Sequence, residues 1–163
     1  MLETSWPLAG RGKELSALTA ALVAGRGAVI TGPAGAGKTT LATLYLQLVR
    51  DRDISVAYTT ATHVSQRLPF GTLAPILPDP GADRLCRDGH GQLLRFYTRA
   101  VTASAGGRPL VVFVDDAHLL DDGSATLVHH LALTGAATVL LTVRTGESRR
   151  HSAAWKSSLG CRE

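Results

Sequence analysis

Short apolar runs alternate with segments of helical periodicity along most of the chain. Runs of aliphatic residues predict strands that are covered on both faces, as in a parallel sheet. Apolar residues three and four positions apart predict amphipathic helices between them. The predicted strands are residues 28–31, 54–59, 110–114 and 139–143, and the predicted helices are residues 13–23, 39–49, 92–104 and 121–133. This alternation predicts an α/β fold with a parallel sheet and crossover helices.

Local sequence signals refine two of these segments. Prolines break residues 60–88, where we expect only a short apolar helix over residues 70–77 and a loop. Ser124 is expected to cap the last predicted helix. Asp121 and Asp122 are interpreted as charges at the N-terminus of that helix rather than as catalytic groups, because acidic side chains are favoured there.

Composition and length predict one cytoplasmic domain. The chain has 163 residues, of which 45% are apolar and 5% aromatic, so its core must be mainly aliphatic. The N-terminus lacks a signal-peptide pattern, and no apolar run reaches the roughly 18 to 20 residues of a membrane span. Cys86 and Cys161 form no CxxC pair, which excludes a disulfide scaffold and a cysteine-based zinc site. We therefore expect a cytoplasmic protein with reduced thiols and no membrane contact.

The net charge of +4 is concentrated at the C-terminal end of the chain. Residues 144–163 hold five basic and two acidic side chains, which leaves 12 basic and 11 acidic side chains for the remainder. A DNA-binding face needs a basic patch or stripe over the fold, and the nearly neutral body offers none. We therefore expect no direct DNA binding by this segment.

The strongest chemical signal is GPAGAGKT at residues 32–39, which fits the P-loop pattern GxxxxGK[ST] between a predicted strand and a predicted helix. Its glycines let backbone N–H groups turn toward phosphate oxygens, and the following helix adds its positive dipole end. Lys38 is expected to reach the β- and γ-phosphates, and Thr39 to offer its hydroxyl to Mg²⁺. The residues assigned to nucleotide binding are Gly32, Pro33, Ala34, Gly35, Ala36, Gly37, Lys38, Thr39 and Thr40.

Two carboxylates follow the most strand-like run of the chain, LVVFV. In a parallel sheet this strand delivers them to the same edge as the P-loop. We assign Asp115 to the Mg²⁺ shell through a water molecule, and Asp116 to polarising the water that attacks the phosphate. The alternative is a solvated pair of acids between a strand and a loop.

Polar residues at and near this edge complete the candidate set. Thr142 and Arg144 end the fourth predicted strand, where the arginine could contact the γ-phosphate; the alternative is a surface arginine. His118 is expected to pack or to form hydrogen bonds. It makes no metal set with His129 and His130, because adjacent side chains face different sides of a helix.

Three strings of the chain, VITGPAGAGKTTLA, LVVFVDDAHLLDDGS and VLLTVRTGE, resemble the ATPase module of STAND-class regulators. More narrowly, residues 8–147 resemble the N-terminal part of large LuxR-type bacterial transcription regulators that contain an ATP-binding domain. LAGRGKEL is similar to the GRxxEL element that lies near the adenine in these AAA-related ATPases, which implies that Gly10 and Arg11 contact the nucleotide.

The resemblance also implies a fold and the role of two residues. It implies a three-layer P-loop NTPase core of the ASCE/AAA type with about four parallel strands flanked by helices. Arg144 corresponds to the sensor arginine after the fourth core strand. Asp116 stands where many AAA relatives have Glu, and its side chain is one methylene shorter. Slow hydrolysis is therefore expected.

The chain departs from the family after its sensor arginine. We find no fifth strand, lid, helical-repeat region or helix-turn-helix, and we interpret residues 148–163 as a basic, poorly structured tail. The expected division is an ATPase core over residues 1–147, with an N-terminal helix element over 8–24 and the nucleotide-binding sheet and helices over 28–143. We expect a truncated product with an exposed strand edge over Val29 and Ile30, which makes it marginally stable and aggregation-prone.

The function that these residues predict is a regulatory switch module that binds ATP or ADP with Mg²⁺ and hydrolyses ATP slowly. Self-association or regulator domains outside this chain are the expected partners. Two alternatives stay open. A P-loop small-molecule kinase usually carries an acid soon after its second strand, and this region is acid-poor here. The second alternative is a fragment that binds nucleotide without catalysis. The sequence also does not decide between ATP and GTP.

Overall fold

The computed structural model describes residues 12–25, 27–50, 52–79 and 89–146, and the following account is confined to them. The strands are β1 (Ala28–Gly32), β2 (Ser55–Thr60), β3 (Leu110–Asp115) and β4 (Thr138–Arg144). The α-helices are α1 (Gly12–Val23), α2 (Lys38–Arg50), α4 (His90–Ser104) and α5 (Asp122–Leu133). Short 3₁₀ helices are η1 (Ser65–Arg67), η2 (Ala74–Ile76) and η3 (Ala117–Leu119).

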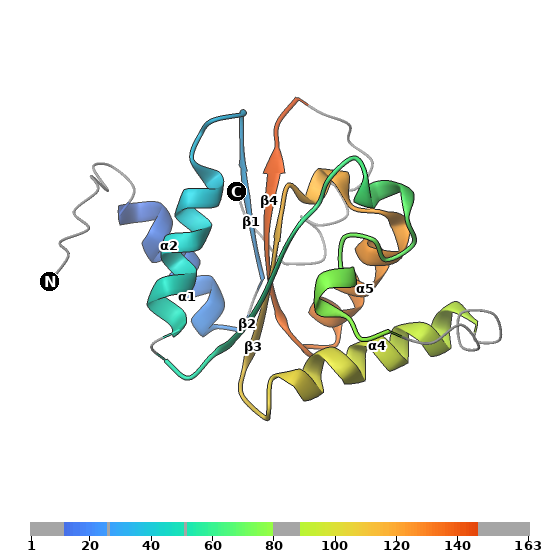
Figure 1. Ribbon diagram of the computed structural model, residues 1–163. Coiled ribbons are helices and arrows are strands. Elements are labelled where there is room, and N and C mark those ends of the chain that lie inside the picture. The colour runs from blue at the N-terminus through green and yellow to red at the C-terminus, as the bar shows by residue number, and fades with distance from the viewer. Residues whose placement is uncertain (1–11, 26, 51, 80–88, 147–163) are drawn as a thin grey trace, which may run out of the picture.

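The four strands form one parallel sheet in the order β1-β4-β3-β2. Helices α1 and α2 cover one face of this sheet, and α4 and α5 cover the other (Figure 1). The three-layer α/β fold with four parallel strands that we expected from the sequence is therefore confirmed. Among the described residues β1 pairs only with β4, so the strand that leads into the P-loop lies at one edge of the sheet.

Two apolar clusters, one on each side of the sheet, form the core. Leu41, Tyr45 and Val49 of α2 pack against the sheet on one side, because they recur four residues apart along one helix face. Leu127 and Leu131 of α5 contribute to the cluster on the other side. Every residue of β3 is buried, as expected for a central strand covered on both faces.

The strand register brings the carboxyl ends of β1, β3 and β4 to the same edge of the sheet. Gly32 at the end of β1 pairs with Arg144 at the end of β4. Val114 of β3 pairs with Leu141 of β4, so Asp115 comes next to Thr142. The sheet therefore collects the P-loop, the acidic pair and the end of the fourth strand in one place.

The structure shortens one predicted helix and shows that one predicted cap is wrong. The short helix expected over residues 70–77 is confined to η2, and turns precede it from Phe70, whose φ is 57°. The cap of α5 is Asp121, whose carboxylate accepts a hydrogen bond from the Ser124 backbone N–H. Ser124 itself is buried inside the first turn of the helix.

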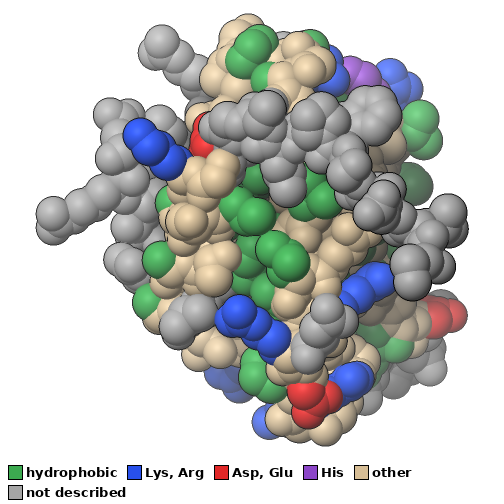
Figure 2. Space-filling model, turned by 90° about the vertical axis from the view of Figure 1, so that its left-hand side faces the viewer, with side chains coloured by type: hydrophobic (Ala, Val, Ile, Leu, Met, Phe, Trp, Pro, Cys, Tyr) green, Lys and Arg blue, Asp and Glu red, His purple; other side chains and the backbone are tan. Residues whose placement is uncertain are grey.

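The face that carries α1 and α2 is shown in Figure 2. Apolar side chains are interspersed there with basic side chains, and the basic side chains in view are scattered rather than gathered into a stripe. Leu48 of α2 is among the exposed large apolar residues of the described chain. No helix in the described ranges is long and apolar enough to span a membrane.

Candidate nucleotide-binding site

The P-loop of this chain is the connection between β1 and α2, and its glycines have the backbone conformations that such a loop requires. Gly35 and Gly37 have φ of 73° and 71°, values that L side chains rarely adopt. The Ala36 N–H donates to the Pro33 carbonyl oxygen at 3.3 Å, which closes a turn. Helix α2 then begins at Lys38, and the first N–H groups of a helix have no intrahelical acceptor. The loop and the helix start thus offer backbone donors for an anion.

The Lys38 side chain lies against the loop that precedes it. Its Nζ donates to the carbonyl oxygens of Gly32 at 3.1 Å and of Pro33 at 2.9 Å. An ammonium group has three N–H donors, and these carbonyls use two of them. Only 8% of the residue is exposed, although it carries a charge. The carbonyl contacts therefore hold the positive charge of Lys38 at the loop.

Asp115, the last residue of β3, is held by hydroxyl groups from two other elements. Thr39 Oγ1 lies 3.0 Å from Oδ1 and 2.9 Å from Oδ2 of the carboxylate and donates to it. Thr142 Oγ1 of β4 also donates to Oδ1. The first helical turn after the P-loop and the end of the central strand, 76 residues apart in sequence, therefore meet at one carboxylate.

Asp116 follows in a left-handed conformation, with φ of 52° and ψ of 43°. Its N–H donates to Thr142 Oγ1 at 2.9 Å, so one buried hydroxyl contacts both acidic residues. The Asp116 carboxylate lies 3.9 Å from Nη2 of Arg144 and 3.9 Å from Nδ1 of His118. The structure thus brings the predicted residues Asp115, Asp116 and Arg144 together at the carboxyl edge of the sheet.

His118 belongs to the same edge, and its side chain is only 3% exposed. Its Nδ1 accepts a hydrogen bond from the Arg144 backbone N–H at 3.5 Å. This contact confirms the prediction of a packing or hydrogen-bonding histidine. Gly10 and Arg11, which the sequence assigned to nucleotide binding, lie outside the described residues. Within the described ranges, no group of three or more His, Cys, Asp or Glu side chains is placed to hold a metal ion.

The sequence did not predict how many hydrogen bonds Asp121 accepts. Besides capping α5, its carboxylate accepts hydrogen bonds from the backbone N–H groups of Phe70 at 2.8 Å and Thr72 at 3.3 Å. The signal that identifies its capping role is an Asp three residues before Ser124 at the start of an apolar helix. The sequence carries no comparable signal for the contacts with the segment around Phe70, which lies 51 residues away.

Residues 7–143 match a protein-family model described as an AAA ATPase domain. The match covers the P-loop, the acidic pair and most of β4. No curated protein sequence matches the chain.

Solved structures resemble the fold at low sequence identity. The Orc1 protein of Aeropyrum pernix in complex with DNA is 19% identical, with a TM-score of 0.63, over 92% of this chain and 43% of that one. AMPPCP-bound DnaA from Aquifex aeolicus is 18% identical, with a TM-score of 0.53, over 91% and 45% of the two chains. Pif1 helicase from Candida albicans is 16% identical, with a TM-score of 0.53, over 80% and 31%. The chain thus spans less than half the length of each of these proteins, and the similarity shows a shared fold.

Proposed function

We propose that this chain, which belongs to the AAA ATPase domain family, binds ATP with Mg²⁺ and hydrolyses it slowly. We propose further that it acts as the switch module of a transcriptional regulator. The observation that carries the proposal is the contact between Thr39 and Asp115. It joins a P-loop hydroxyl to a buried carboxylate at the edge where the backbone donors of the loop also lie.

The donors of the loop fit a chain of phosphates. Residues 34–37 and the N-terminus of α2 would supply backbone N–H groups to the phosphate oxygens. Lys38 would release the carbonyls of Gly32 and Pro33 and turn its ammonium toward the β- and γ-phosphates. This exchange replaces two neutral acceptors by charged ones, and hydrogen bonds between charged groups are the stronger kind.

The oxygen donors fit a magnesium ion. Mg²⁺ prefers hydroxyl, carboxylate and water oxygens, and it keeps several waters when bound beside a nucleotide. Thr39 would hold the ion directly, and Asp115 would hold it through a water molecule. When bound, the ion would offset the negative charge of the phosphates. Only an exchange of hydrogen bonds is needed, because Thr39 already contacts Asp115.

Asp116 and Arg144 would act on the terminal phosphate. Asp116 would orient and polarise the attacking water, and Arg144 would contact the γ-phosphate. Their present separation of 3.9 Å supports this pairing of roles, since both side chains already reach the same space. The Asp116 side chain is short, so we expect slow turnover. Loss of the γ-phosphate would leave Arg144 without its ligand, which is the change that a switch requires.

The regulatory role is supported by the resemblance of three motif strings to ATP-binding LuxR-type regulators. Its partners would be a second copy of the chain or regulator domains, with DNA contacted by a segment other than this one. Gly10 and Arg11 would contact the adenine end of the nucleotide. This part of the proposal is tested by measuring whether ATP changes DNA binding by the chain in complex with its regulator partner; an ATP-independent DNA affinity would refute it.

Binding of labelled ATP and release of phosphate without any acceptor test the core of the proposal. We expect Mg²⁺-dependent binding and slow phosphate release for the natural chain. Lys38→Ala should abolish both, whereas the control Arg95→Ala, at an exposed position of α4, should change neither. Binding without release would favour a non-catalytic nucleotide-binding module. Release only after addition of a small-molecule acceptor would favour a kinase, and absence of binding would refute the proposal.

A further inference from the structure

His118 lies on η3, the short helix that follows the two acidic residues, and its imidazole is buried beside the end of β4. The side chain is 3% exposed. Its Nδ1 accepts a hydrogen bond from the Arg144 backbone N–H at 3.5 Å, and the same nitrogen lies 3.9 Å from Oδ1 of Asp116. One ring nitrogen therefore faces both of the residues that would act on the terminal phosphate.

The strand register explains what this nitrogen does. The pairs of β3 and β4 end with Val114 opposite Leu141, so Arg144 lies three residues beyond the last pair. Successive N–H groups of a strand point to opposite sides within a sheet. The next N–H along β4, that of Thr145, donates to the Gly32 carbonyl oxygen at 3.0 Å, so the Arg144 N–H points to the other side. On that side β3 has already ended, and His118 Nδ1 stands where a strand carbonyl would otherwise accept.

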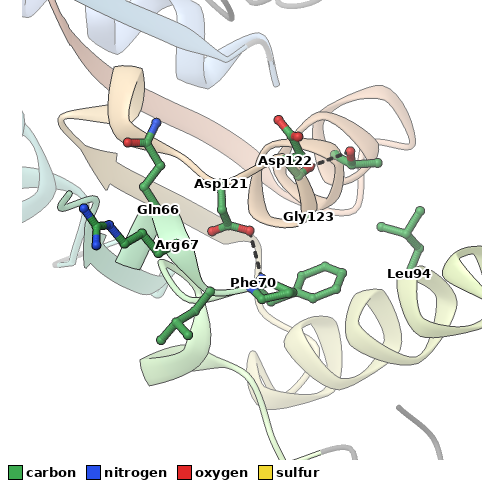
Figure 3. A pocket seen from close by; sticks show the side chains of 10 residues that line it. Gln66, Arg67, Phe70, Leu94, Asp121, Asp122 and Gly123 are labelled. Atoms are coloured by element: carbon green, nitrogen blue, oxygen red, sulfur yellow. Dashed lines mark hydrogen bonds between the residues drawn. The ribbon is translucent and has the colours of Figure 1, made fainter. Parts of the chain in front are cut away.

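The short helix that carries His118 is anchored at both ends. At its start, the Asp116 N–H donates to Thr142 Oγ1 at 2.9 Å. Just past its end, the Asp121 carboxylate accepts from the Phe70 N–H at 2.8 Å, as Figure 3 shows beside the cavity that these two residues line. A side chain that positions another residue must itself be held by its surroundings. These anchors meet that requirement for His118.

The hydrogen bond also places the proton on the imidazole ring. A ring nitrogen that accepts from an N–H group has no proton, so neutral His118 carries its proton on Nε2. Nδ1 then offers no hydrogen to the Asp116 carboxylate, which keeps its contact with Arg144 at 3.9 Å. The imidazole thus holds the Arg144 backbone without competing for Asp116.

We propose that His118 is a positioning residue of the proposed ATPase: it fixes the end of β4, so that the Arg144 guanidinium reaches both Asp116 and the γ-phosphate. This inference rests on the proposed function, and it gives His118 a role beyond packing. Without the imidazole the Arg144 N–H loses its acceptor, and the end of β4 is freer to move. A displaced guanidinium weakens the transition state more than it weakens nucleotide binding, because catalysis depends on close alignment.

Two substitutions separate the acceptor from the bulk of the ring. The asparagine side-chain oxygen can occupy the place of Nδ1 and accept the same hydrogen bond, whereas leucine fills the space without an acceptor. His118→Leu should lower kcat for phosphate release about fivefold and change KM for ATP less than about twofold. His118→Asn should keep kcat within about twofold of the natural value. The control His130→Leu makes the same change at a half-buried position of α5 and should alter neither constant.

A double-mutant cycle tests whether His118 acts through Arg144. Arg144→Gln removes the guanidinium, so adding His118→Leu to it should lower kcat less than about twofold further. Independent action would instead multiply the two losses. If the double variant shows the full product of the single losses, the proposal is wrong.

Amide hydrogen exchange tests the contact itself and requires no ATP. The Arg144 amide should exchange about fivefold faster in His118→Leu than in the natural chain, and at nearly the natural rate in His118→Asn. The Thr145 amide, which donates to Gly32, serves as the internal control and should exchange equally in all three chains.

Nitrogen chemical shifts of the His118 ring in the natural chain add a test that needs no variant. With the imidazole neutral, Nε2 should carry the proton and Nδ1 should carry none. This measurement decides even if His118→Leu, checked by circular dichroism, does not fold. A proton on Nδ1, equal Arg144 exchange in His118→Leu and the natural chain, or equal kcat in the two would each overturn the proposal. If the natural chain releases no phosphate, the proposed function fails, and the exchange rates still decide whether His118 holds Arg144.

Discussion

Asp115 and Asp121 are two buried carboxylates on either side of η3, and the structure uses them differently. Their exposures are almost equal, at 7% and 6%. Asp115 accepts hydrogen bonds from the side-chain hydroxyls of Thr39 and Thr142. Asp121 accepts three hydrogen bonds, all from backbone N–H groups. Burial is the same in the two cases, and the kind of donor differs.

The kind of donor decides what each carboxylate can do. A hydroxyl rotates about its C–O bond, so Thr39 can leave Asp115 for another acceptor or bind a metal ion through its oxygen. A backbone N–H is fixed by the chain, and an unpaired one in the interior costs about as much as a lost hydrogen bond. Asp115 can therefore exchange its partners, as the proposed magnesium site requires, whereas Asp121 holds the fold.

The largest effect on stability is expected for Asp121→Ala. Three buried N–H groups lose their charged acceptor and α5 loses its cap, so we expect the free energy of unfolding to fall by about 3 kcal/mol or more. Urea denaturation followed by circular dichroism measures it. The control Asp122→Ala changes an exposed neighbour and should cost under about 1 kcal/mol. If Asp121→Ala and Asp122→Ala lower the free energy of unfolding equally, Asp121 does not hold the fold in the way that its three hydrogen bonds indicate.

Asp115→Asn should change stability little and phosphate release strongly, in contrast to Asp121→Ala. The amide oxygen still accepts from a threonine hydroxyl, so the free energy of unfolding should change by less than about 1 kcal/mol. The negative charge next to the proposed Mg²⁺ is lost, and we expect phosphate release to fall about a hundredfold, which corresponds to about 2.7 kcal/mol. Release measured over a range of Mg²⁺ concentrations checks this. A strongly destabilised variant would mean that Asp115 is as structural as Asp121.

Thr142→Val should lower both the free energy of unfolding and the rate of phosphate release, each by less than the variants above. Valine keeps the shape of threonine but leaves the Asp116 N–H and the Asp115 carboxylate without their shared hydroxyl, which should cost about 1 to 2 kcal/mol of stability. Denaturant melts and phosphate release are the two measurements. Thr142→Ser restores the hydroxyl and should recover most of the release rate. If Thr142→Ser behaves like Thr142→Val, the methyl group matters instead, and the hydroxyl does not hold the acidic pair.

The sequence predicted which residues meet at the carboxyl edge of the sheet. These residues lie at the ends of strands and helices that have a strong apolar pattern. The run LVVFV defines β3, and a parallel neighbour brings Asp115 beside Thr142 by register alone. The glycines of the P-loop reveal its conformation, since Gly35 and Gly37 adopt positive φ. Strand ends and special glycines are local signals, and the sheet converts them into a three-dimensional arrangement.

The segment around Phe70 could not be predicted in this way. Its apolar residues predict a helix over residues 70–77, but only η2 forms there, and the Asp121 carboxylate accepts from the N–H groups of Phe70 and Thr72 before it. The competing partner lies about 50 residues further along the chain, so no local window contains it. Tertiary hydrogen bonds of this kind set where the chain turns, and local propensity does not report them.

Ser124→Ala should change the free energy of unfolding least, and it should raise this free energy rather than lower it. The backbone N–H of Ser124 donates to Asp121, and this bond does not depend on the side chain. The buried Ser124 hydroxyl has no hydrogen-bond partner among the described residues. Removing a buried, unpaired hydroxyl should raise the free energy of unfolding by about 0.5 to 1 kcal/mol. Urea denaturation of the two chains side by side measures it. A loss of more than about 1 kcal/mol would show that the Ser124 side chain takes part in holding Asp121. The backbone-only description of that carboxylate would then fail.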